Sequence, residues 1–171
     1  MDQKKERFSK LLEEHIGIIR KLCRGYSNTK EDCEDYEQEV CYQIWKSIDH
    51  FRGESKVSTW VYRVTLNVCL YMLKKRKKVE LIPMEQKELH QTFEASTSIE
   101  AEDDQEEMMY SSIAMLPPID RAIIMLYLDK NEHAEIASIV GLSLSNVGVR
   151  INRIKKKLKQ IIDERIGKDM G

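Results

Sequence analysis

The chain has 171 residues, 42% of them hydrophobic and 33% charged, which is typical of a soluble helical protein with one ordinary domain or two small ones. No apolar run approaches the about 20 residues that span a bilayer, and the first ten residues lack the apolar segment of a secretory signal. These features exclude direct membrane insertion, and we expect a cytoplasmic protein.

Cysteine and histidine usage gives no sign of a cofactor or a catalytic cluster. The four cysteines form no C-x-x-C pair, and the four histidines are scattered along the chain. Neither a disulfide framework nor a metal site is therefore indicated, and we expect no metal and no cofactor. We expect small, buried or half-buried thiols at Cys23, Cys33, Cys41 and Cys69.

The net charge of −1 conceals a strong separation of charge along the chain. Residues 1–78 carry 17 Lys and Arg against 12 Asp and Glu, residues 79–120 carry 1 against 11, and residues 121–171 carry 10 against 6. The three segments thus have net charges of +5, −10 and +4. Two basic segments joined by an acidic one fit two modules that face nucleic acid better than one mixed surface.

Two amphipathic helices are predicted in the first fifty residues. Apolar residues at helical spacing predict the first helix from about Lys5 to Tyr26. Six acids between Glu31 and Glu39 favour the N-terminal end of a second helix through the helix dipole. Its buried stripe is expected to be Tyr36, Val40, Ile44 and Ile48. Trp45 lies off that stripe, either as part of a partner-binding patch or as a cover for the edge of the core.

The segment from Asp49 to Lys78 combines a polar turn, a helix and a basic end. We expect a left-handed Gly53 and a Ser55 that caps the next helix. The stripe predicted to face the core is Val57, Val61, Val64, Val68 and Met72, which turns Tyr62, Arg63 and Asn67 towards another face. Stacking of unpaired bases and phosphate binding would use Arg52, Lys56, Trp60, Tyr62, Arg63, Asn67, Lys74, Lys75 and Arg76. The alternative remains that the aromatic residues belong to the core and the lysines to a solvated helix end.

Residues 79–105 are interpreted as an acidic flexible linker, because apolar periodicity is weak there and Pro83 ends any helix. Helical spacing returns from about Glu106 to Leu116, and Pro118 or Ile119 can begin the next helix. The apolar run from Arg121 to Tyr127 is expected to be buried.

The C-terminal part has the pattern of a helix-turn-helix. Glu135–Val140 precedes the turn Gly141-Leu142-Ser143, and a long amphipathic helix follows from Leu144. Ser143 is expected to cap that helix, and its buried stripe to be Val147, Ile151, Ile154 and Leu158. The side chains left exposed suit contact with base edges and phosphates, although a plain helical hairpin is the alternative. They are Ser145, Asn146, Arg150, Asn152, Arg153, Lys155, Lys156 and Lys157.

Two motif sets, in the right order and spacing, resemble the extracytoplasmic-function group of bacterial RNA polymerase sigma factors. Glu34–Val40 with Trp45 is similar to E-D-x-x-Q-E-V-F-x-x-x-W, and Phe51–Ser55 with Thr59–Val64 and Asn67 is similar to F-R-G-E-S-x-F-x-T-W-L-Y-R-I-x-x-N. The second set is Leu116-Pro117, Glu135-Ile136-Ala137, Gly141-Leu142-Ser143 and Asn146–Arg153. The resemblance implies an all-α fold, with sigma region 2 in residues 1–78 and region 4 in residues 106–171.

The resemblance also implies partners and residue roles. The coiled coil of the largest subunit of core RNA polymerase would bind Asp35, Gln38, Glu39, Tyr42 and Trp45. The loop from Arg52 to Ser58 and the face with Trp60, Tyr62, Arg63 and Asn67 would open and hold minus-10 promoter DNA. The minus-35 duplex would be read by Ser143, Ser145, Asn146, Val149, Arg150, Arg153 and Lys157. The linker would run towards the RNA exit path, an anti-sigma factor would restrain the protein, and the protein would be no enzyme.

The chain departs from the family pattern in several places, among them Val57 and Val149, which replace residues that vary widely in the group. Lys130-Asn131-Glu132-His133 replaces the usual Gly, apolar residue and Ser before the helix-turn-helix, and we expect Asn131 to cap its first helix instead. Gly148 costs about 1 kcal/mol relative to Ala inside a helix, and we expect its missing side chain to allow close approach to DNA.

Two other functions are weighed against the sigma factor. A DNA-binding regulator would use only the helix-turn-helix and would not need the Asp35 to Trp45 surface. A metal-dependent hydrolase would need clustered His and Asp, which the sequence lacks.

Overall fold

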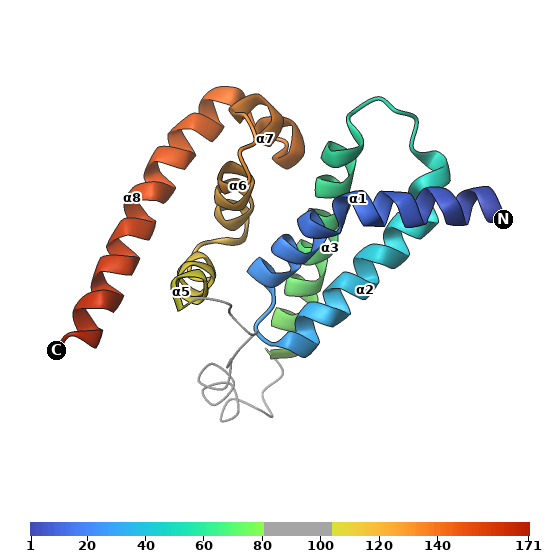
Figure 1. Ribbon diagram of the computed structural model, residues 1–171. Helices are drawn as coiled ribbons and strands as arrows, with labels where there is room; N and C mark the ends of the chain where they lie inside the picture. The colour runs from blue at the N-terminus through green and yellow to red at the C-terminus, as the bar shows by residue number, and fades with distance from the viewer. Residues whose placement is uncertain (81–103) are drawn as a thin grey trace. The chain divides into compact units, whose positions relative to one another are not determined.

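The computed structural model describes residues 1–80 and 104–171, which belong to two compact units (Figure 1). All regular structure in these two ranges is helical, so the predicted all-α fold with two helical domains is confirmed. Most of the predicted linker lies outside the described residues. No single helix within the described ranges is long and apolar enough to cross a membrane. The pair His133–Val140 and Leu144–Asp169 meets that criterion only jointly, across a bend of 102°.

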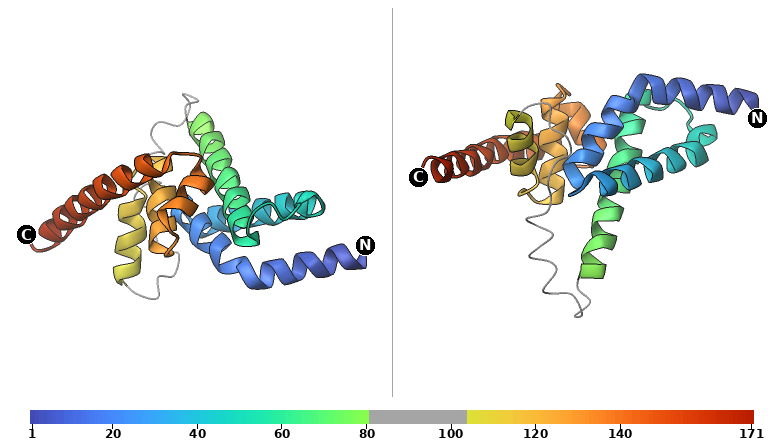
Figure 2. Two further views of the ribbon diagram at one scale, coloured as in Figure 1. Left: turned by 90° about the horizontal axis from the view of Figure 1, so that it is seen from above. Right: turned by 60° about the horizontal axis from the view of Figure 1, so that its bottom comes forward.

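The first unit is built from three helices and a short 3-10 turn. Its elements are α1 (Asp2–Tyr26), α2 (Lys30–Ser47), η1 (Ile48–His50) and α3 (Val57–Glu80). Thr29 caps α2, because its hydroxyl accepts a hydrogen bond of 3.1 Å from the backbone N–H of Asp32. Each of the three α-helices packs against the other two (Figure 2). The predicted stripe Tyr36, Val40, Ile44 and Ile48 is buried between them, as expected.

The buried face of α3 differs from the predicted one. Val61 and Val68 are buried as predicted, but Val57 is 38% exposed and the buried set also contains Tyr62, Thr65, Leu66, Cys69 and Leu73. The prediction that Tyr62 lies on the exposed face is therefore wrong. Because α3 packs against both α1 and α2, it buries a wider arc than a single stripe.

The turn before α3 is only partly as predicted. Gly53 has φ of +74°, the left-handed conformation expected for it. Ser55, however, lies two residues before the first helical residue, and its hydroxyl donates to the carbonyl oxygen of Lys56 at 3.3 Å. The prediction that Ser55 caps α3 is therefore wrong.

The cysteines contribute to packing, as predicted. Cys23, Cys33 and Cys69 are buried, Cys41 is half-buried, and all four are free thiols. The Sγ atoms of Cys23 on α1 and Cys69 on α3 lie 4.0 Å apart. The hydrogen bond to Cys69 and burial both raise the pKa of the Cys23 thiol, which keeps it uncharged in the core.

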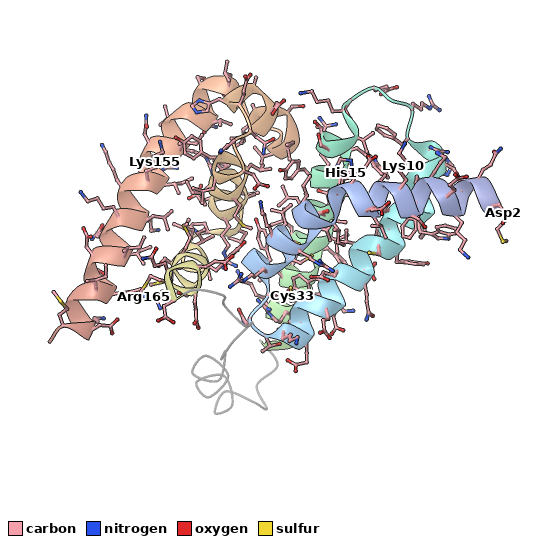
Figure 3. The ribbon with its side chains drawn as sticks, viewed as in Figure 1. Asp2, Lys10, His15, Cys33, Lys155 and Arg165 are labelled. Carbon is pink, nitrogen blue, oxygen red and sulfur yellow. The ribbon has the colours of Figure 1, made fainter. Side chains whose placement is uncertain are left out.

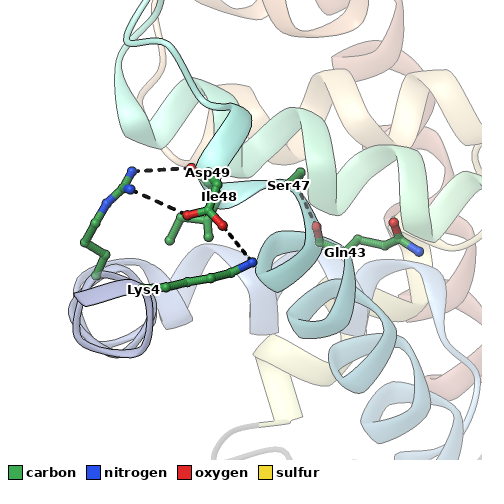
Figure 4. Close-up of polar contacts among 6 residues, drawn as sticks. Lys4, Gln43, Ser47, Ile48 and Asp49 are labelled. Carbon is green, nitrogen blue, oxygen red and sulfur yellow. Dashed lines mark hydrogen bonds and ion pairs between the residues drawn. The ribbon is translucent and has the colours of Figure 1, made fainter. Parts of the chain in front are cut away.

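An ionic contact fastens the N-terminal part of α1 to η1 (Figure 4). Lys4 Nζ lies 2.8 Å from Asp49 Oδ2, and Arg7 Nη1 lies 3.8 Å from Asp49 Oδ1. Arg7 also donates to the carbonyl oxygen of Ile48 at 3.3 Å. The hydrogen bond from Lys4 lowers the pKa of Asp49. These bonds anchor the chain at the point where the loop from Phe51 to Lys56 begins.

The second unit contains α5 (Asp104–Ile113), α6 (Pro118–Leu128), α7 (His133–Val140) and α8 (Leu144–Asp169). The long helix α8 packs against the other three (Figure 2). Pro118 occupies the start of α6, as predicted. Of the run predicted to be buried, Ala122–Leu126 are buried, and Arg121 and Tyr127 at its two ends are half-buried.

The helix-turn-helix is confirmed in its geometry. Gly141 ends α7 with φ of +74°, and the Ser143 hydroxyl accepts from the backbone N–H of Asn146 at 3.2 Å. The predicted inner stripe of α8 is buried in full. It consists of Val147, Ile151, Ile154 and Leu158.

The expected cap on α7 is not present. The residue before α7 is Glu132, which makes no capping bond through its side chain. Asn131 instead donates from its side-chain amide to the carbonyl oxygen of Leu126 at 2.9 Å. The prediction for Asn131 is therefore wrong, because this amide satisfies a carbonyl at the C-terminal end of α6.

The Lys4–Asp49 contact predicts a specific dependence of stability on pH. Because the folded-state pKa of Asp49 is lowered, its contribution is present above the unfolded-state pKa of about 4 and is lost as pH falls through the folded-state value. Urea unfolding from pH 7 to pH 3 should therefore show a smaller acid-induced loss for Asp49→Asn than for the wild type. The effect should be small, because the Asp49 side chain is 48% exposed. Asp35→Asn, at an exposed site on α2, is the control, and identical pH profiles for Asp49→Asn and wild type would contradict the assignment.

Gly148 predicts a stabilising substitution. A Cβ atom at this position would lie 3.8 Å from His133 Nδ1, an ordinary van der Waals distance. Gly148→Ala should therefore raise the free energy of unfolding by about 1 kcal/mol in urea denaturation, because Ala has the higher helix propensity. The matched control is Gly141→Ala, which should destabilise because the left-handed backbone disfavours a side chain. Destabilisation by Gly148→Ala would show that α8 cannot accept a methyl group there.

Candidate functional site

An exposed polar strip runs along α3. Arg63, Asn67, Tyr71, Lys74 and Lys78 follow one another at spacings of three and four residues, so they share one helix face. Arg63 is half-buried and the other four are exposed, with Tyr71 62% exposed. Lys75 is exposed beside them. The sequence predictions missed Tyr71, although its position four residues after Asn67 was the available signal.

Trp60 lies at the beginning of α3 and packs against Phe51 in the loop that precedes the helix. Its ring centroid lies 5.0 Å from that of Phe51, with the planes tilted by 33°. Trp60 is half-buried, while Arg52 and Lys56 in the loop are exposed. The indole is therefore neither fully buried nor fully exposed, and both alternatives for this residue stay open.

Arg76 does not lie with the other cations of α3. Its guanidinium lies 3.4 Å from Asp32 Oδ2 on α2 and donates to the carbonyl oxygen of Tyr26 at 3.5 Å. The Arg76 side chain is only 22% exposed, whereas Lys74 and Lys75 are exposed. This residue thus ties the end of α3 to α1 and α2.

The outer face of α2 carries Asp35, Gln38 and Tyr42, which share a face and are all exposed. Tyr42 is 54% exposed, and Lys46 Nζ lies 5.4 Å from its ring centroid. Glu39 is half-buried and accepts a hydrogen bond of 2.8 Å from Gln43. The structure therefore brings three of the five predicted polymerase-binding residues into one exposed line.

Trp45 lies at the edge of the contact between α2 and α1. Its ring meets that of Phe8 edge to face, with centroids 5.2 Å apart and an interplanar angle of 84°. Lys4 Nζ lies 4.7 Å from the indole centroid. Trp45 therefore covers the core edge and keeps part of its surface accessible, since it is half-buried.

The exposed face of α8 begins at its N-terminal turn. Side chains at helical spacing lie opposite the buried stripe and carry polar groups first and cations further along. They are Ser145, Asn146, Val149, Arg153, Lys156 and Lys157. Val149, at 66% exposure, provides an apolar contact within this polar strip.

Three other cations of α8 are used within the unit. Lys155 Nζ lies 2.6 Å from the Tyr127 hydroxyl and 4.2 Å from that ring centroid (Figure 3). Arg165 donates to the Ser111 hydroxyl at 2.8 Å (Figure 3). Arg150 Nη1 lies 3.1 Å from Asp120 Oδ1 on α6, and Arg150 Nε donates to Asn146 Oδ1 at 3.2 Å. Arg150 is thus held between Asp120 and Asn146, and Asn146 is the most exposed of these three side chains.

The exposed faces of α2, α3 and α8 carry charged, amide and aromatic side chains. In residues 1–80 and 104–171, no group of three or more His, Cys, Asp or Glu is placed to hold a metal ion. The strips on α3 and α8 combine cations with amides and, on α3, an exposed aromatic ring. Such combinations suit phosphate backbones and base edges or faces.

Two family models match the chain. The model of sigma-70 region 2 matches residues 11–79, and that of sigma-70 region 4 matches residues 106–158. The first match covers α2 and all of α3 except its last residue, and the second covers the helix-turn-helix.

Curated relatives agree with the family models. SigM of Mycobacterium tuberculosis, an ECF RNA polymerase sigma factor, is 22% identical over 91% of this chain and 76% of its own length. SigW of Bacillus subtilis is 25% identical over 90% of this chain and 87% of its own length. For SigE of Mycolicibacterium smegmatis, at 23% identity, the alignment spans 91% of this chain but 61% of the relative.

Solved structures share the fold. The sigma factor RpoE from Bartonella quintana, in complex with the anti-sigma factor NepR, has a TM-score of 0.70 at 17% identity and covers 92% of this chain and 98% of its own. CnrH, in complex with the cytosolic domain of CnrY, has a TM-score of 0.66 at 21% identity and covers 94% of this chain and 90% of its own. With regions 2 and 4 both matched and in that order, the chain belongs to the sigma-70 family of RNA polymerase sigma factors, in its extracytoplasmic-function group.

Proposed function

We propose that this chain is a promoter-specific initiation subunit, which binds core RNA polymerase and directs it to DNA with minus-10 and minus-35 elements. The observation that carries the proposal is the presence of both sigma regions, each with an exposed polar and basic strip on one long helix. A DNA-binding regulator would need only the second unit. The bonds made in RNA synthesis would be the work of the core enzyme.

The outer face of α2 is proposed as the surface for core polymerase. Asp35, Gln38 and Tyr42 form its exposed line, and Glu39 and Trp45 form its half-buried margin. Tyrosine and tryptophan are enriched among the residues that contribute most to the binding energy of protein interfaces. The partner is the coiled coil of the largest polymerase subunit.

The strip on α3 and the loop before it are proposed to hold the opened minus-10 strand. Trp60, Asn67 and Tyr71 would contact unpaired bases, and Arg52, Lys56, Arg63, Lys74 and Lys75 would contact phosphates. Tyr62 and Arg76 are left out of this set. Tyr62 is 6% exposed, and Arg76 is bonded to Asp32 and Tyr26.

The strip on α8 is proposed to read the minus-35 duplex in the major groove. Ser143, Ser145, Asn146 and Val149 lie at its N-terminal end, and Arg153 and Lys157 follow. An anti-sigma protein is the proposed inhibitor, because the two similar structures are complexes with the anti-sigma factor NepR and with the cytosolic domain of CnrY.

Run-off transcription tests the proposed function directly. Core polymerase from the native host, given this chain and a pool of genomic fragments, should initiate at new sites that share two spaced upstream elements. Transcription at the level of core polymerase alone, with duplex binding retained, would instead support the regulator. A Tyr42→Ala chain is the control for core binding.

The α3 strip makes a sharper prediction. Trp60→Ala, Asn67→Ala and Tyr71→Ala should each reduce open-complex formation, while core binding stays close to wild type. Loss of one aromatic stack is worth about 1–3 kcal/mol, or roughly 5-fold to 150-fold in the opening equilibrium for Trp60 and Tyr71. Permanganate footprinting of unpaired thymines and a core-binding titration measure the two effects separately. Tyr42→Ala, a matched truncation on α2, should show the reverse pattern, and equal losses in both assays would remove the residue from the DNA face.

A further inference from the structure

A hydrogen-bonded chain of three side chains links α6 to the N-terminal turn of α8. Asp120 Oδ1 on α6 lies 3.1 Å from Arg150 Nη1, and Arg150 Nε lies 3.2 Å from Asn146 Oδ1. The side chain of Asp120 is 13% exposed and that of Arg150 is 30% exposed, whereas Asn146 is exposed. This series of hydrogen bonds therefore runs from a nearly buried carboxylate to an exposed amide.

The donor chemistry fixes which way the Asn146 amide faces. Arginine nitrogens carry only donors, so the atom that faces Arg150 Nε must be the carbonyl oxygen of Asn146. The amide nitrogen of Asn146 then points away from Arg150, with its N–H groups available. The backbone of Asn146 is also held, because its N–H donates to the Ser143 cap at 3.2 Å.

The same contacts hold Arg150 in place. Moving its guanidinium onto a DNA phosphate would leave the Asp120 carboxylate without its partner at a site that is only 13% exposed. Removing one member of a largely desolvated ion pair costs more than the pair itself contributes. A role for Arg150 in orientation is therefore favoured over the phosphate contact expected from sequence.

We propose that Asp120 and Arg150 are positioning residues, which present the Asn146 amide nitrogen to the major groove so that this position selects a base with an exocyclic carbonyl. Guanine O6 and thymine O4 are such acceptors, whereas cytosine and adenine offer an amino group at the corresponding place. This inference rests on the proposed reading of duplex DNA by α8 and names the base class that Asn146 selects. Asp120 becomes a determinant of specificity although it lies on α6.

Selection from a randomised duplex pool tests the inference. Holoenzyme assembled with the full chain would be bound to duplexes carrying a random upstream element, and the bound fraction sequenced. Wild type should select G or T at one position, and Asn146→Asp should move the selection at that position to C or A, because a carboxylate only accepts. Arg150→Gln and Asp120→Asn should each weaken the base preference at that single position. The double variant should weaken this preference no further than either single variant.

The salt dependence separates positioning from phosphate contact. Arg150→Gln should leave the slope of log affinity against log salt unchanged, whereas the control Arg153→Gln should make it shallower by about 0.9 with base preferences intact. A shallower slope for Arg150→Gln with every preference retained would overturn the inference. Selection of C or A by the wild type, at the position whose base preference changes in Asn146→Asp, would also overturn the inference. Initiation by the same holoenzyme in run-off transcription would show that the proposed function stands even where the inference falls.

Discussion

The packing of α3 and α8 against several neighbours decides which side chains are available for binding. α3 contacts both α1 and α2, and α8 contacts α5, α6 and α7. α3, held from two sides, keeps only a narrow exposed strip, which carries Asn67, Tyr71 and Lys74. α8 buries one stripe and leaves its other faces exposed, and Asn146, Val149 and Arg153 lie on these exposed faces near its N-terminal end. The candidate DNA-binding residues are therefore those that the core does not use.

The same packing divides the cations into two groups. Arg76, Arg150, Lys155 and Arg165 make bonds within their own units, to Asp32, Asp120, Tyr127 and Ser111. Each of these bonds joins two helices, so the cations take part in holding the helices that carry the exposed strips. Lys155 is exposed as well as bonded, whereas Lys74, Lys75, Arg153 and Lys157 are exposed and make no such bond to another helix among the described residues. Counting basic residues in the sequence cannot separate the two groups, because the bonding partner of each cation lies on another helix.

Periodicity was sufficient for the helices and for most of their buried faces. The inner stripe of α8 and the Gly141 turn with its Ser143 cap are as predicted, because each depends on residues within a few positions of one another. The errors at Tyr62, Ser55 and Asn131 have a different origin. Tyr62 is buried on a helix that packs against two others, and Asn131 donates to the end of the preceding helix. Such choices depend on where distant or alternative partners lie, which a local pattern does not specify.

The N-terminal end of α1 links two candidate sites in the first unit. Lys4 lies 2.8 Å from Asp49 Oδ2 and 4.7 Å from the centroid of the Trp45 ring. Trp45 borders the proposed polymerase surface on α2, and Asp49 precedes the loop that leads to Trp60. Phe8 packs on the same indole, so the position of this ring is set largely by α1. Lys4 therefore connects the ring at the edge of the proposed polymerase surface to the residue that precedes the loop proposed to hold opened DNA.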